Sequence, residues 1–347
     1  MTSPLQILFV RNNPTSFLNM DLALLSARYQ VRDWYQRGPL FDPTALLRAV
    51  RKCDLVFGWF ASWHTLWPIL AARLLGRPSV LVVGGYDTAS VPSIAYGNMS
   101  KPFKRWISRT TMRLADTLVV NSHFIEEEVV RLAGMPRAKV TMVYHGLDLS
   151  PKDRRPEHTE PSRGRVVLTV GKVDRFNLRR KGLEPFVRAA ALLPSFTFVV
   201  AGPWMDGTIG RLRAISSPNV TFTGRISEEE LDELYRRAAV YVQPSVHEGF
   251  GLSVAEAMLR ECVPVTTRAG ALPEVVGDCG VALDSTDPEA VARGIVQAYA
   301  CRTTLGPRAR DRIIEHFPLE RRDKEFATLI EGAIRRRKAT ADETDRA

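Results

Sequence analysis

The sequence predicts an α/β protein of two doubly wound domains, each built on a parallel sheet. Short apolar runs alternate with helical stretches through the first 150 residues, and the alternation restarts after a polar, proline-rich segment. This order of elements is typical of parallel sheets covered by helices on both faces. The length of 347 residues suits two domains of about 150 residues each.

The first half contains five apolar runs that we interpret as strands: 5–10, 55–58, 79–83, 117–120 and 140–144. Residues 55–76 are apolar enough to suggest a membrane span, but polar residues such as Ser62 and Arg73 interrupt them. We therefore expect a strand there, followed by a helix from Thr65 to Leu75.

The domain boundary is expected in the segment from Leu149 to Gly164, which is polar and rich in proline, as linkers are. The expected organisation is an N-terminal domain at 1–150, a linker at 151–164, a C-terminal domain at 165–318, a terminal helix at 319–338 and a frayed tail at 339–347.

The second half starts with a continuous apolar run from Arg165 to Gly171, as expected for a parallel strand buried on both faces. Further strands are expected at 195–202, 220–224, 239–243 and 262–266, with a helix at 183–192 after the first of them. Ser227 followed by Glu230 is a capping box that predicts a helix from 228 to 238.

The composition and the residue spacing argue against a metalloprotein and against a secreted protein. The four cysteines lack Cys-x-x-Cys spacing, and the six histidines lack metal-ligand spacing, so neither a metal nor another cofactor is expected. The residues after Met1 lead directly into the first strand without a signal peptide. A cytoplasmic protein is expected, peripheral on the inner face of the membrane if it binds one.

The segment from Ser245 to Met258 places two carboxylates eight positions apart around a glycine-rich turn: Ser245-Val-His-Glu248-Gly-Phe-Gly-Leu-Ser-Val-Ala-Glu256-Ala-Met. An apolar strand precedes it, and a helix is expected from Leu252. Gly249 and Gly251 let the backbone turn sharply and approach a ligand. The free N–H groups at the helix start then form a phosphate site at the strand ends.

The two carboxylates predict what lies beside that phosphate. A carboxylate next to an anion is unfavourable, so Glu248 in the loop and Glu256 inside the helix should reach past the phosphates to hydroxyl groups. A nucleotide sugar has hydroxyls on both sides of its diphosphate. The pattern therefore indicates a nucleotide-sugar site, and two solvated carboxylates are the alternative.

This segment resembles the Glu-x7-Glu motif of the family-four retaining glycosyltransferases, also called glycosyl transferases group 1. The resemblance implies the GT-B fold, in which two Rossmann-like doubly wound domains face each other across a cleft and the terminal helix crosses back to the first domain. It implies that Glu248 binds the donor sugar and Glu256 the ribose. The backbone of Phe250, Gly251 and Leu252 would face the distal phosphate, with Gly249 in the same donor loop.

Two lysines match the places where this family clamps the donor diphosphate. Lys172 follows the first strand of the C-terminal half, and Lys181 belongs to a Lys-Gly pair. The family often has Arg at the first place, so Lys172 departs from the pattern and loses a bidentate contact. The nearby Arg175, Arg179 and Arg180 are interpreted as partly solvated loop charges.

The loop before helix 228–238 lies beside the nucleotide base in this family. Arg225 and Ile226 are the corresponding residues, and a solvated loop charge is the alternative for Arg225. The acceptor is expected in the N-terminal domain. Asp87 either contacts acceptor or sugar or caps the next segment, and Asn12 and Asn13 are hydrogen-bonding groups toward the acceptor.

Charge is concentrated in the first 150 residues, with 17 Lys and Arg against 10 Asp and Glu, which leaves +7 of the total +10. The stretch from Lys101 to Arg109 mixes basic and aromatic residues on an expected helix. Two interpretations remain: contact with an anionic membrane surface, or a solvated helix with Phe103, Trp106 and Ile107 in the core. We favour the second.

The resemblance thus implies a metal-independent retaining glycosyltransferase of hexosyltransferase type. A nucleoside-diphosphate sugar is the expected donor, and a glycan or lipid-linked glycan of cell-envelope or polysaccharide synthesis is the expected acceptor. An epimerase or phosphorylase of the same fold is the alternative. A basic nucleic-acid-binding protein is the alternative from another class, but no recognition motif accompanies the pI near 9.7, so no nucleic acid is expected as a partner.

Overall fold

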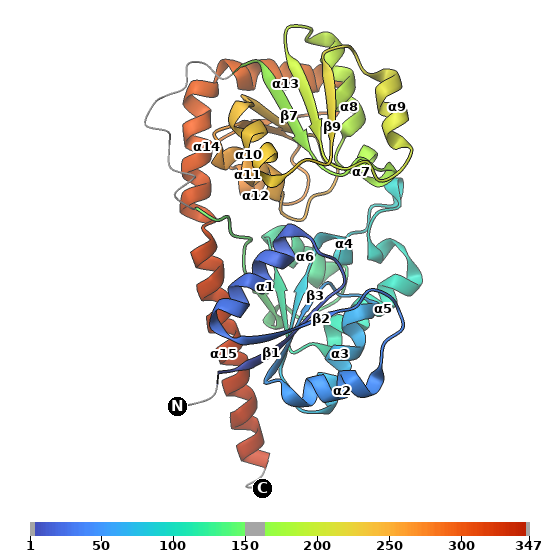
Figure 1. The fold of residues 1–347 in the computed structure, drawn as a ribbon, viewed down its shortest axis with the longest axis vertical. Helices are drawn as coiled ribbons and strands as arrows, with labels where there is room; N and C mark the ends of the chain where they lie inside the picture. Colours follow the sequence, from blue (N-terminus) through green and yellow to red (C-terminus); the bar gives the residue numbers. More distant parts are fainter. Residues whose placement is uncertain (1–3, 150–163, 345–347) are drawn as a thin grey trace. The chain divides into compact units, whose positions relative to one another are not determined.

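The computed structural model describes residues 4–149 and 164–344. The chain divides into two compact units, of which unit 1 comprises residues 1–144 with 320–347 and unit 2 comprises residues 145–319 (Figure 1). Apart from Gly164, the linker expected at 151–164 lies outside the described residues.

Unit 1 is built on a six-stranded parallel sheet with the order β2-β1-β3-β4-β5-β6. Its strands are β1 (Gln6–Arg11), β2 (Gln30–Tyr35), β3 (Leu55–Trp59), β4 (Ser79–Val83), β5 (Thr117–Val120) and β6 (Val140–Met142). The five predicted strands are present. The strand β2 was not predicted, because its polar sequence lacks an apolar run.

Helices cover both faces of this sheet. They are α1 (Ser16–Arg28), α2 (Pro43–Lys52), α3 (Trp63–Leu74), α4 (Gly85–Thr88), α5 (Pro102–Leu114), α6 (His123–Arg131) and α15 (Leu319–Thr344), with the short 3-10 turns η1 (Pro92–Ile94), η2 (Asn98–Ser100) and η3 (Arg137–Lys139). Apolar side chains of α1 and α15 pack on one face. Those of α2, α3, α5 and α6 pack on the other.

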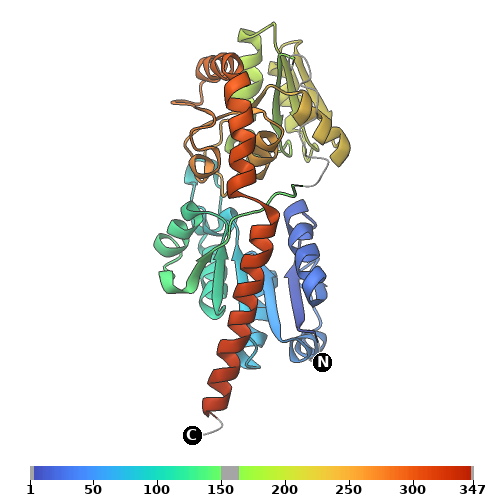
Figure 2. The same ribbon diagram turned by 90° about the vertical axis from the view of Figure 1, so that its left-hand side faces the viewer.

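The helix α15 joins unit 1 through a buried ion pair. The guanidinium of Arg322 donates to both carboxylate oxygens of Asp21 on α1, at 2.7 and 2.8 Å, and both side chains have no exposed surface. Asp21 also accepts a hydrogen bond from the indole N–H of Trp59 at 2.9 Å. Figure 2 shows α15, in red, lying along the sheet of unit 1. The helix ends at Thr344, beyond the expected 338, and the last three residues of the predicted tail are not described.

The expectation that Phe103 and Trp106 face the core of unit 1 is wrong. Phe103 is 71% exposed and Trp106 is 58% exposed, and only Ile107 is half-buried. Both aromatic residues lie in the first two turns of α5, whereas the core contact of this helix comes from residues further along, such as Met112.

Unit 2 has a second six-stranded parallel sheet, with the order β12-β11-β10-β7-β8-β9. Its strands are β7 (Val166–Val170), β8 (Thr197–Ala201), β9 (Val220–Gly224), β10 (Val240–Gln243), β11 (Val263–Thr266) and β12 (Val281–Ala282). Its helices are α7 (Arg175–Arg180), α8 (Leu183–Ala189), α9 (Thr208–Ile215), α10 (Glu228–Arg237), α11 (Leu252–Leu259), α12 (Leu272–Val276), α13 (Pro288–Ala300) and α14 (Arg302–His316), with a 3-10 turn η5 (Ala190–Leu192) after α8. The predicted capping box of Ser227 and Glu230 starts α10.

Both units are therefore doubly wound α/β folds, as the sequence predicts. Within the part of the chain that the structure describes, no helix combines the length and apolar character needed to span a bilayer.

Candidate active site

The predicted donor residues of unit 2 gather at the carboxyl ends of β7 and β10. These strands are neighbours at the point where the strand order reverses, because the chain leaves β7 for β8 and β9 and returns to β10 on the other side. The connections on the two sides run in opposite directions, which leaves room for a ligand there. The loop after β7 leads to Lys181, and the loop after β10 carries Glu248.

Lys181 is held as a fixed positive charge at this point. Its Nζ donates to the carbonyl oxygen of Val170 at 3.1 Å, to Oε1 of Gln243 at 3.1 Å and to Oγ of Ser253 at 3.3 Å. These partners come from the end of β7, the end of β10 and the first turn of α11. The ammonium is therefore tied to the strand ends and to the start of the helix that was predicted to bind phosphate.

Burial lowers the pKa of Lys181 to about 8, while the charges of Glu248 and Glu256 oppose that shift. Both carboxylates thus lie close enough to Lys181 to act on its charge. The structure brings together the three side chains that the sequence analysis placed at the diphosphate, the sugar and the ribose.

Gln243 links Lys181, Glu248 and Ser253, and we call these four residues the Gln243 cluster. Gln243 was not identified from the sequence. Its Oε1 accepts from Lys181, from Oγ of Ser253 at 3.0 Å and from Oη of Tyr241 at 3.1 Å, while its Nε2 donates to Oε2 of Glu248 at 2.8 Å. Its side chain is fully buried. The signal available in the sequence was a polar residue at the end of an apolar strand. That strand, β10, lies where the strand order reverses.

Glu248 is bound on one side only. Its Oε2 accepts from Gln243 and from Nη1 of Arg180 at 3.2 Å. Within the described part of the chain, no hydrogen bond reaches Oε1. Burial alone would raise the pKa of Glu248, but the charges of Arg180 and Lys181 outweigh it and leave the pKa below its usual value. Glu248 is therefore an ionised acceptor of hydrogen bonds.

The interpretation of Arg180 as a partly solvated charge is wrong. Its side chain is 13% exposed, and it forms the ion pair with Glu248. Arg180 also donates to the carbonyl oxygen of His247 at 3.3 Å and to Oδ1 of Asn177, so it fixes the loop that carries Glu248. No sequence pattern distinguishes Arg180 from Arg175 or Arg179 as the arginine that faces inward.

Glu256 lies on α11 and accepts a hydrogen bond from Oη of Tyr235 on α10 at 2.8 Å. Burial raises the pKa of Glu256, and the Tyr235 hydrogen bond and the charge of Lys181 only partly offset the rise. Tyr235 therefore orients this carboxylate from the next helix, a contact with no signature in the sequence.

The loop before α11 depends on two glycines with positive φ. Gly251 is the N-cap residue of α11 with φ of 100°, as predicted, whereas Gly249 is not among the residues with positive φ. Gly270 has φ of 63°, and a Cβ there would lie 2.0 Å from the carbonyl oxygen of Glu248. That carbonyl accepts the N–H of Ala271 at 2.9 Å. The loop of Glu248 therefore packs directly on the Gly270 turn.

Phe250 contributes packing as well as backbone to this loop. Its side chain is buried, with ring centroids 5.1 Å from His145 and 5.4 Å from Phe317. Leu252 is the first residue of α11. The aromatic contacts anchor the turn between Glu248 and the helix start.

Three other predicted donor residues lie on neighbouring loops. Lys172 is exposed between β7 and α7, and its carbonyl accepts from Nδ2 of Asn177 at 3.1 Å. Arg225 is exposed and Ile226 half-buried between β9 and α10. In the described ranges, no hydrogen bond joins these side chains to the Gln243 cluster.

The acceptor residues predicted in unit 1 follow the strand ends. Asn12 and Asn13 come directly after β1, which is flanked by β2 and β3 at the order reversal of that sheet. Asp87 is buried, and its Oδ2 accepts the N–H groups of Ala61 at 3.0 Å and Gly84 at 2.9 Å. Burial raises the pKa of Asp87 to about 7. The carboxylate thus caps α4 and ties together the segments after β3 and β4.

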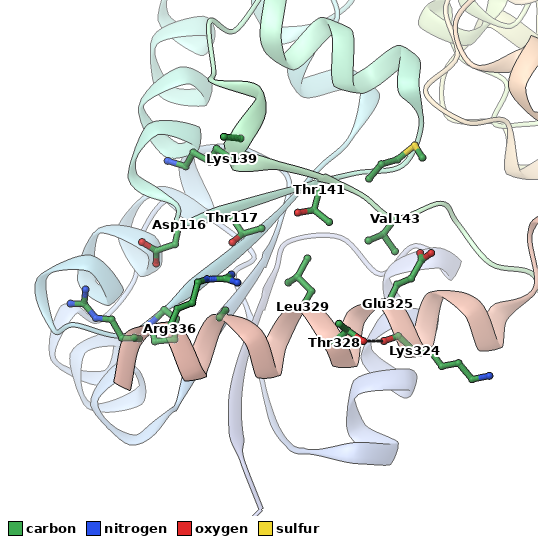
Figure 3. Close-up of a pocket in the computed structure, with 15 residues that line it drawn as sticks. Asp116, Thr117, Lys139, Thr141, Val143, Lys324, Glu325, Thr328, Leu329 and Arg336 are labelled. Carbon is green, nitrogen blue, oxygen red and sulfur yellow. Dashed lines mark hydrogen bonds between the residues drawn. The ribbon is translucent and has the colours of Figure 1, made fainter. Parts of the chain in front are cut away.

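A separate cavity of about 900 Å³ lies in unit 1, beside α15 and the strands β5 and β6. Figure 3 shows Thr141, Val143, Glu325 and Leu329 around it. None of the predicted site residues lines this cavity. It is therefore distinct from the strand-end sites.

The fold and the site together define a class: an α/β protein of two doubly wound units in which a lysine and a helix start lie beside two carboxylates. Among the residues that the structure describes, no group of three His, Cys, Asp or Glu side chains is placed to hold a metal ion.

Sequence profiles identify the family within this class. The profile described as Glycosyltransferase Family 4 matches residues 9–151, and the profile described as Glycosyl transferases group 1 matches residues 164–301. The chain belongs to this glycosyltransferase family, as the sequence analysis predicted.

Three curated relatives illustrate the similarity. A D-inositol 3-phosphate glycosyltransferase of Mycolicibacterium vanbaalenii is 31% identical over 63% of this chain and 54% of its own length. An O-antigen chain mannosyltransferase B of Escherichia coli is 28% identical over 53% and 51%. An alpha-galactosylglucosyldiacylglycerol synthase of Streptococcus pneumoniae is 30% identical over 51% and 52%. The chain spans about half the length of these relatives.

Solved structures share the fold over most of the chain. Anabaena HepE, solved with UDP and glucose, superposes with a TM-score of 0.73 at 15% identity, covering 94% of this chain and all of HepE. Sucrose-phosphate synthase of Thermosynechococcus elongatus has a TM-score of 0.73 at 19% identity, covering 94% and 98%. The prediction of two Rossmann-like domains of GT-B type is confirmed.

Proposed function

We propose that the protein transfers a hexose from a nucleoside-diphosphate sugar to a hydroxyl acceptor, with retention of anomeric configuration and without a metal ion. The observation that carries the proposal is the position of Lys181. Its ammonium is tied to the ends of β7 and β10 and to the first turn of α11, next to the ionised Glu248. A cation, a helix start and a carboxylate fit a diphosphate with a sugar attached.

The donor contacts follow from this placement. The diphosphate lies between Lys181 and the N–H groups of Phe250, Gly251 and Leu252, with Lys172 as a second cation. Oε1 of Glu248 accepts from a sugar hydroxyl and Glu256 accepts from the ribose, because both are half-buried acceptors beside the phosphate position. Gly249 belongs to the same loop, and Arg225 and Ile226 lie beside the base. HepE, which has this fold, was solved with UDP-glucose, and this supports a donor of that class.

The reaction needs no side chain that acts as a strong general base. The acceptor hydroxyl attacks the anomeric carbon from the face that the diphosphate leaves, and an oxygen of the departing phosphate takes the proton. The bond from sugar to phosphate breaks as the new glycosidic bond forms. Lys181 and Lys172 stabilise the charge that develops on the nucleoside diphosphate. Glu248 orients the sugar during the step.

The acceptor is a glycan or a lipid-linked glycan of cell-envelope or polysaccharide synthesis, bound by unit 1 with Asn12, Asn13 and Asp87 at its site. The names of the relatives, which include an O-antigen mannosyltransferase and a glycolipid synthase, support this substrate class. A cytoplasmic protein that works at the inner face of the membrane fits such an acceptor.

The test incubates the protein with UDP-, GDP- and ADP-sugars and follows the released nucleoside diphosphate and the sugar. Release with one donor is expected, and Lys181→Met should lower it roughly a hundredfold. Arg293→Met, which removes one exposed charge from α13, is the control and should leave it unchanged. Measuring the anomeric configuration of the product tests retention.

Other outcomes would replace the proposal. Conversion of the donor to a different sugar nucleotide indicates an epimerase, and release of a sugar phosphate from a glycan in inorganic phosphate indicates a phosphorylase. No turnover, together with salt-sensitive DNA binding, indicates the nucleic-acid-binding alternative.

A further inference from the structure

The start of α5 carries an aromatic pair that the core of unit 1 does not use. Phe103 is 71% exposed and Trp106 is 58% exposed. Their ring centroids lie 6.3 Å apart with an interplanar angle of 21°, so the rings stack on each other at the surface. Because the fold buries neither ring, a large apolar area lies in water. Such an area favours a partner that covers it.

Basic residues surround this pair. Lys104 and Arg105 lie between the two aromatics in sequence and are exposed, and Lys101 is the N-cap residue of the helix. The Nζ of Lys104 lies 5.9 Å from the ring centroid of Tyr86 on α4. We refer to Lys101, Phe103, Lys104, Arg105 and Trp106 as the α5 patch.

Acidic residues are almost missing from the elements that pack beside the patch. From Phe60 to Ala115, a range that includes α3, α4 and α5, the sequence has seven basic residues and a single acid, Asp87. Asp87 is buried and bound to two backbone N–H groups. The α3 helix, which lies beside α5 in Figure 1, carries Arg73 and no carboxylate. No exposed carboxylate within this range neutralises the patch.

The patch also lies at the positive end of its helix. Pro102 is the first residue of α5, and its N-cap residue Lys101 makes no side-chain capping hydrogen bond. Cations at a helix start are unfavourable in the isolated protein, because they add to the positive potential of the unpaired N–H groups. A phosphate bound there would relieve that repulsion.

We propose that the α5 patch binds the surface of an anionic phospholipid bilayer. Phe103 and Trp106 enter the interfacial layer, where aromatic side chains partition favourably, and Lys101, Lys104 and Arg105 contact the lipid phosphates. The charge pattern favours an anionic bilayer over a neutral glycan or an ordinary protein surface.

The location of the patch relates to the proposed acceptor site. Lys104 reaches Tyr86, and Tyr86 precedes Asp87 in α4, so the patch lies at the carboxyl-end side of the sheet of unit 1. This relation rests on the proposed function: a membrane-borne acceptor would reach the strand ends of unit 1 from the surface that the patch binds. The bilayer contact itself needs no reaction.

The experiment sediments the full-length protein with vesicles of phosphatidylcholine, alone or partly replaced by phosphatidylglycerol. The protein should bind the anionic vesicles at least roughly tenfold more tightly than the neutral ones. The double variant Phe103→Ser/Trp106→Ser and the double variant Lys104→Glu/Arg105→Glu should each lose roughly tenfold or more of that affinity. Because all four side chains are exposed, thermal unfolding should be unchanged.

Matched controls test whether the location matters. Trp204→Ser removes an aromatic residue that is 42% exposed in unit 2, and Arg51→Glu/Lys52→Glu reverses two exposed charges at the end of α2 in unit 1. Both controls should bind the anionic vesicles nearly as the unaltered protein does. The nucleoside-diphosphate thermal shift of every variant should stay unchanged, which separates this proposal from the donor site.

Three results would overturn the proposal. The proposal is wrong if the unaltered protein sediments with neither vesicle type. If the control and patch variants lose equal affinity for anionic vesicles, the binding depends on the net charge of the protein and not on the α5 patch. A patch variant that binds vesicles normally but needs more of a water-soluble glycan acceptor would assign the aromatic pair to carbohydrate stacking.

Discussion

At the residue scale, Lys181 combines two properties that oppose each other. Its ammonium has three acceptors within the protein, which favours the charged form, and its partial burial disfavours that form. Burial wins and lowers the pKa of Lys181 to about 8. A bound diphosphate would favour the charged form again, so the free and bound proteins should differ in protonation.

This difference predicts a pH dependence of donor binding. Below pH 8 the free protein already has the ammonium that the diphosphate needs, so affinity should be independent of this group. Above pH 8 binding must first protonate Lys181, and the Kd for the nucleoside diphosphate should rise by up to about tenfold per pH unit. Calorimetric titration at several pH values should also detect proton uptake in the alkaline range.

Lys181→Arg is the control for this dependence. Arginine stays charged across the range, so any binding that the variant retains should be flat above pH 8. A Kd of the unaltered protein that is constant from pH 7 to 10 would contradict the linkage between donor binding and the protonation of Lys181.

The sequence predicted Glu248 and Glu256 because the Glu-x7-Glu motif fixes their spacing, and it predicted Lys181 because this residue belongs to a Lys-Gly pair. It could not predict Gln243 as their connection, because a glutamine at a strand end has no partner until β7, β10 and α11 are placed side by side. Arg180 shows the same limit: three arginines lie in one short helix, and only the packing against the Glu248 loop selects one.

At the element scale, the turn at Gly270 holds the loop after β10 in place. Gly270→Ala puts a methyl group 2.0 Å from the carbonyl oxygen of Glu248, at a backbone with φ of 63°. The variant should lose about 3 kcal/mol of unfolding free energy in a denaturant titration, from left-handed strain and overpacking. Donor affinity should fall as well, because Glu248 must move.

Gly210→Ala is the matched control in the same unit. Gly210 lies in α9, and a Cβ there has no atom within 4 Å. Gly210→Ala should leave the free energy of unfolding unchanged or raise it by up to about 1 kcal/mol, because alanine is the better helix former. Similar losses for Gly210→Ala and Gly270→Ala would mean that the contact with Glu248 does not matter.

The attachment of α15 gives a second prediction at this scale. Asp21→Ala leaves the guanidinium of Arg322 buried without its carboxylate, and this should cost about 3–5 kcal/mol in the unfolding of unit 1. The comparison is Arg28→Ala, which breaks the exposed pair of Arg28 and Asp323 between the same two helices. Water screens that pair, so its loss should shift the thermal midpoint little. Equal shifts in the two variants would contradict the assigned role of the buried pair.

The sequence predicted those elements whose burial leaves a simple pattern. The strands β3, β4 and β5 are buried throughout and mostly apolar, because helices cover both their faces. The edge strand β2 is mostly exposed or half-buried, and its polar sequence gave no signal. The pattern of α5 was misread for a related reason: aromatic residues usually indicate a core face, and only the structure shows that Phe103 and Trp106 lie beyond the edge of that core.

At the scale of the whole molecule, the two units have different charge and different chemistry. Unit 1 has 25 Lys and Arg against 16 Asp and Glu, a net charge of +9, so unit 2 contributes only +1 of the total +10. The Gln243 cluster, by contrast, is built from residues of unit 2 alone. A donor should therefore bind without any acceptor, and each unit should respond to its own ligand.

Hydrogen exchange of the full chain tests this division. A nucleoside diphosphate should slow exchange at residues 171–182 and 244–256, because its phosphates engage the amides at the start of α11 and its charge holds Lys181 and the loops around it. At a concentration a hundred times the Kd it should add about 2.7 kcal/mol to the stability of the binding-competent state. Lys181→Met should weaken both effects, while Arg293→Met should preserve them. Protection confined to residues 5–143 would place the donor on unit 1, and the assignment of Lys181, Glu248 and Glu256 would then be wrong.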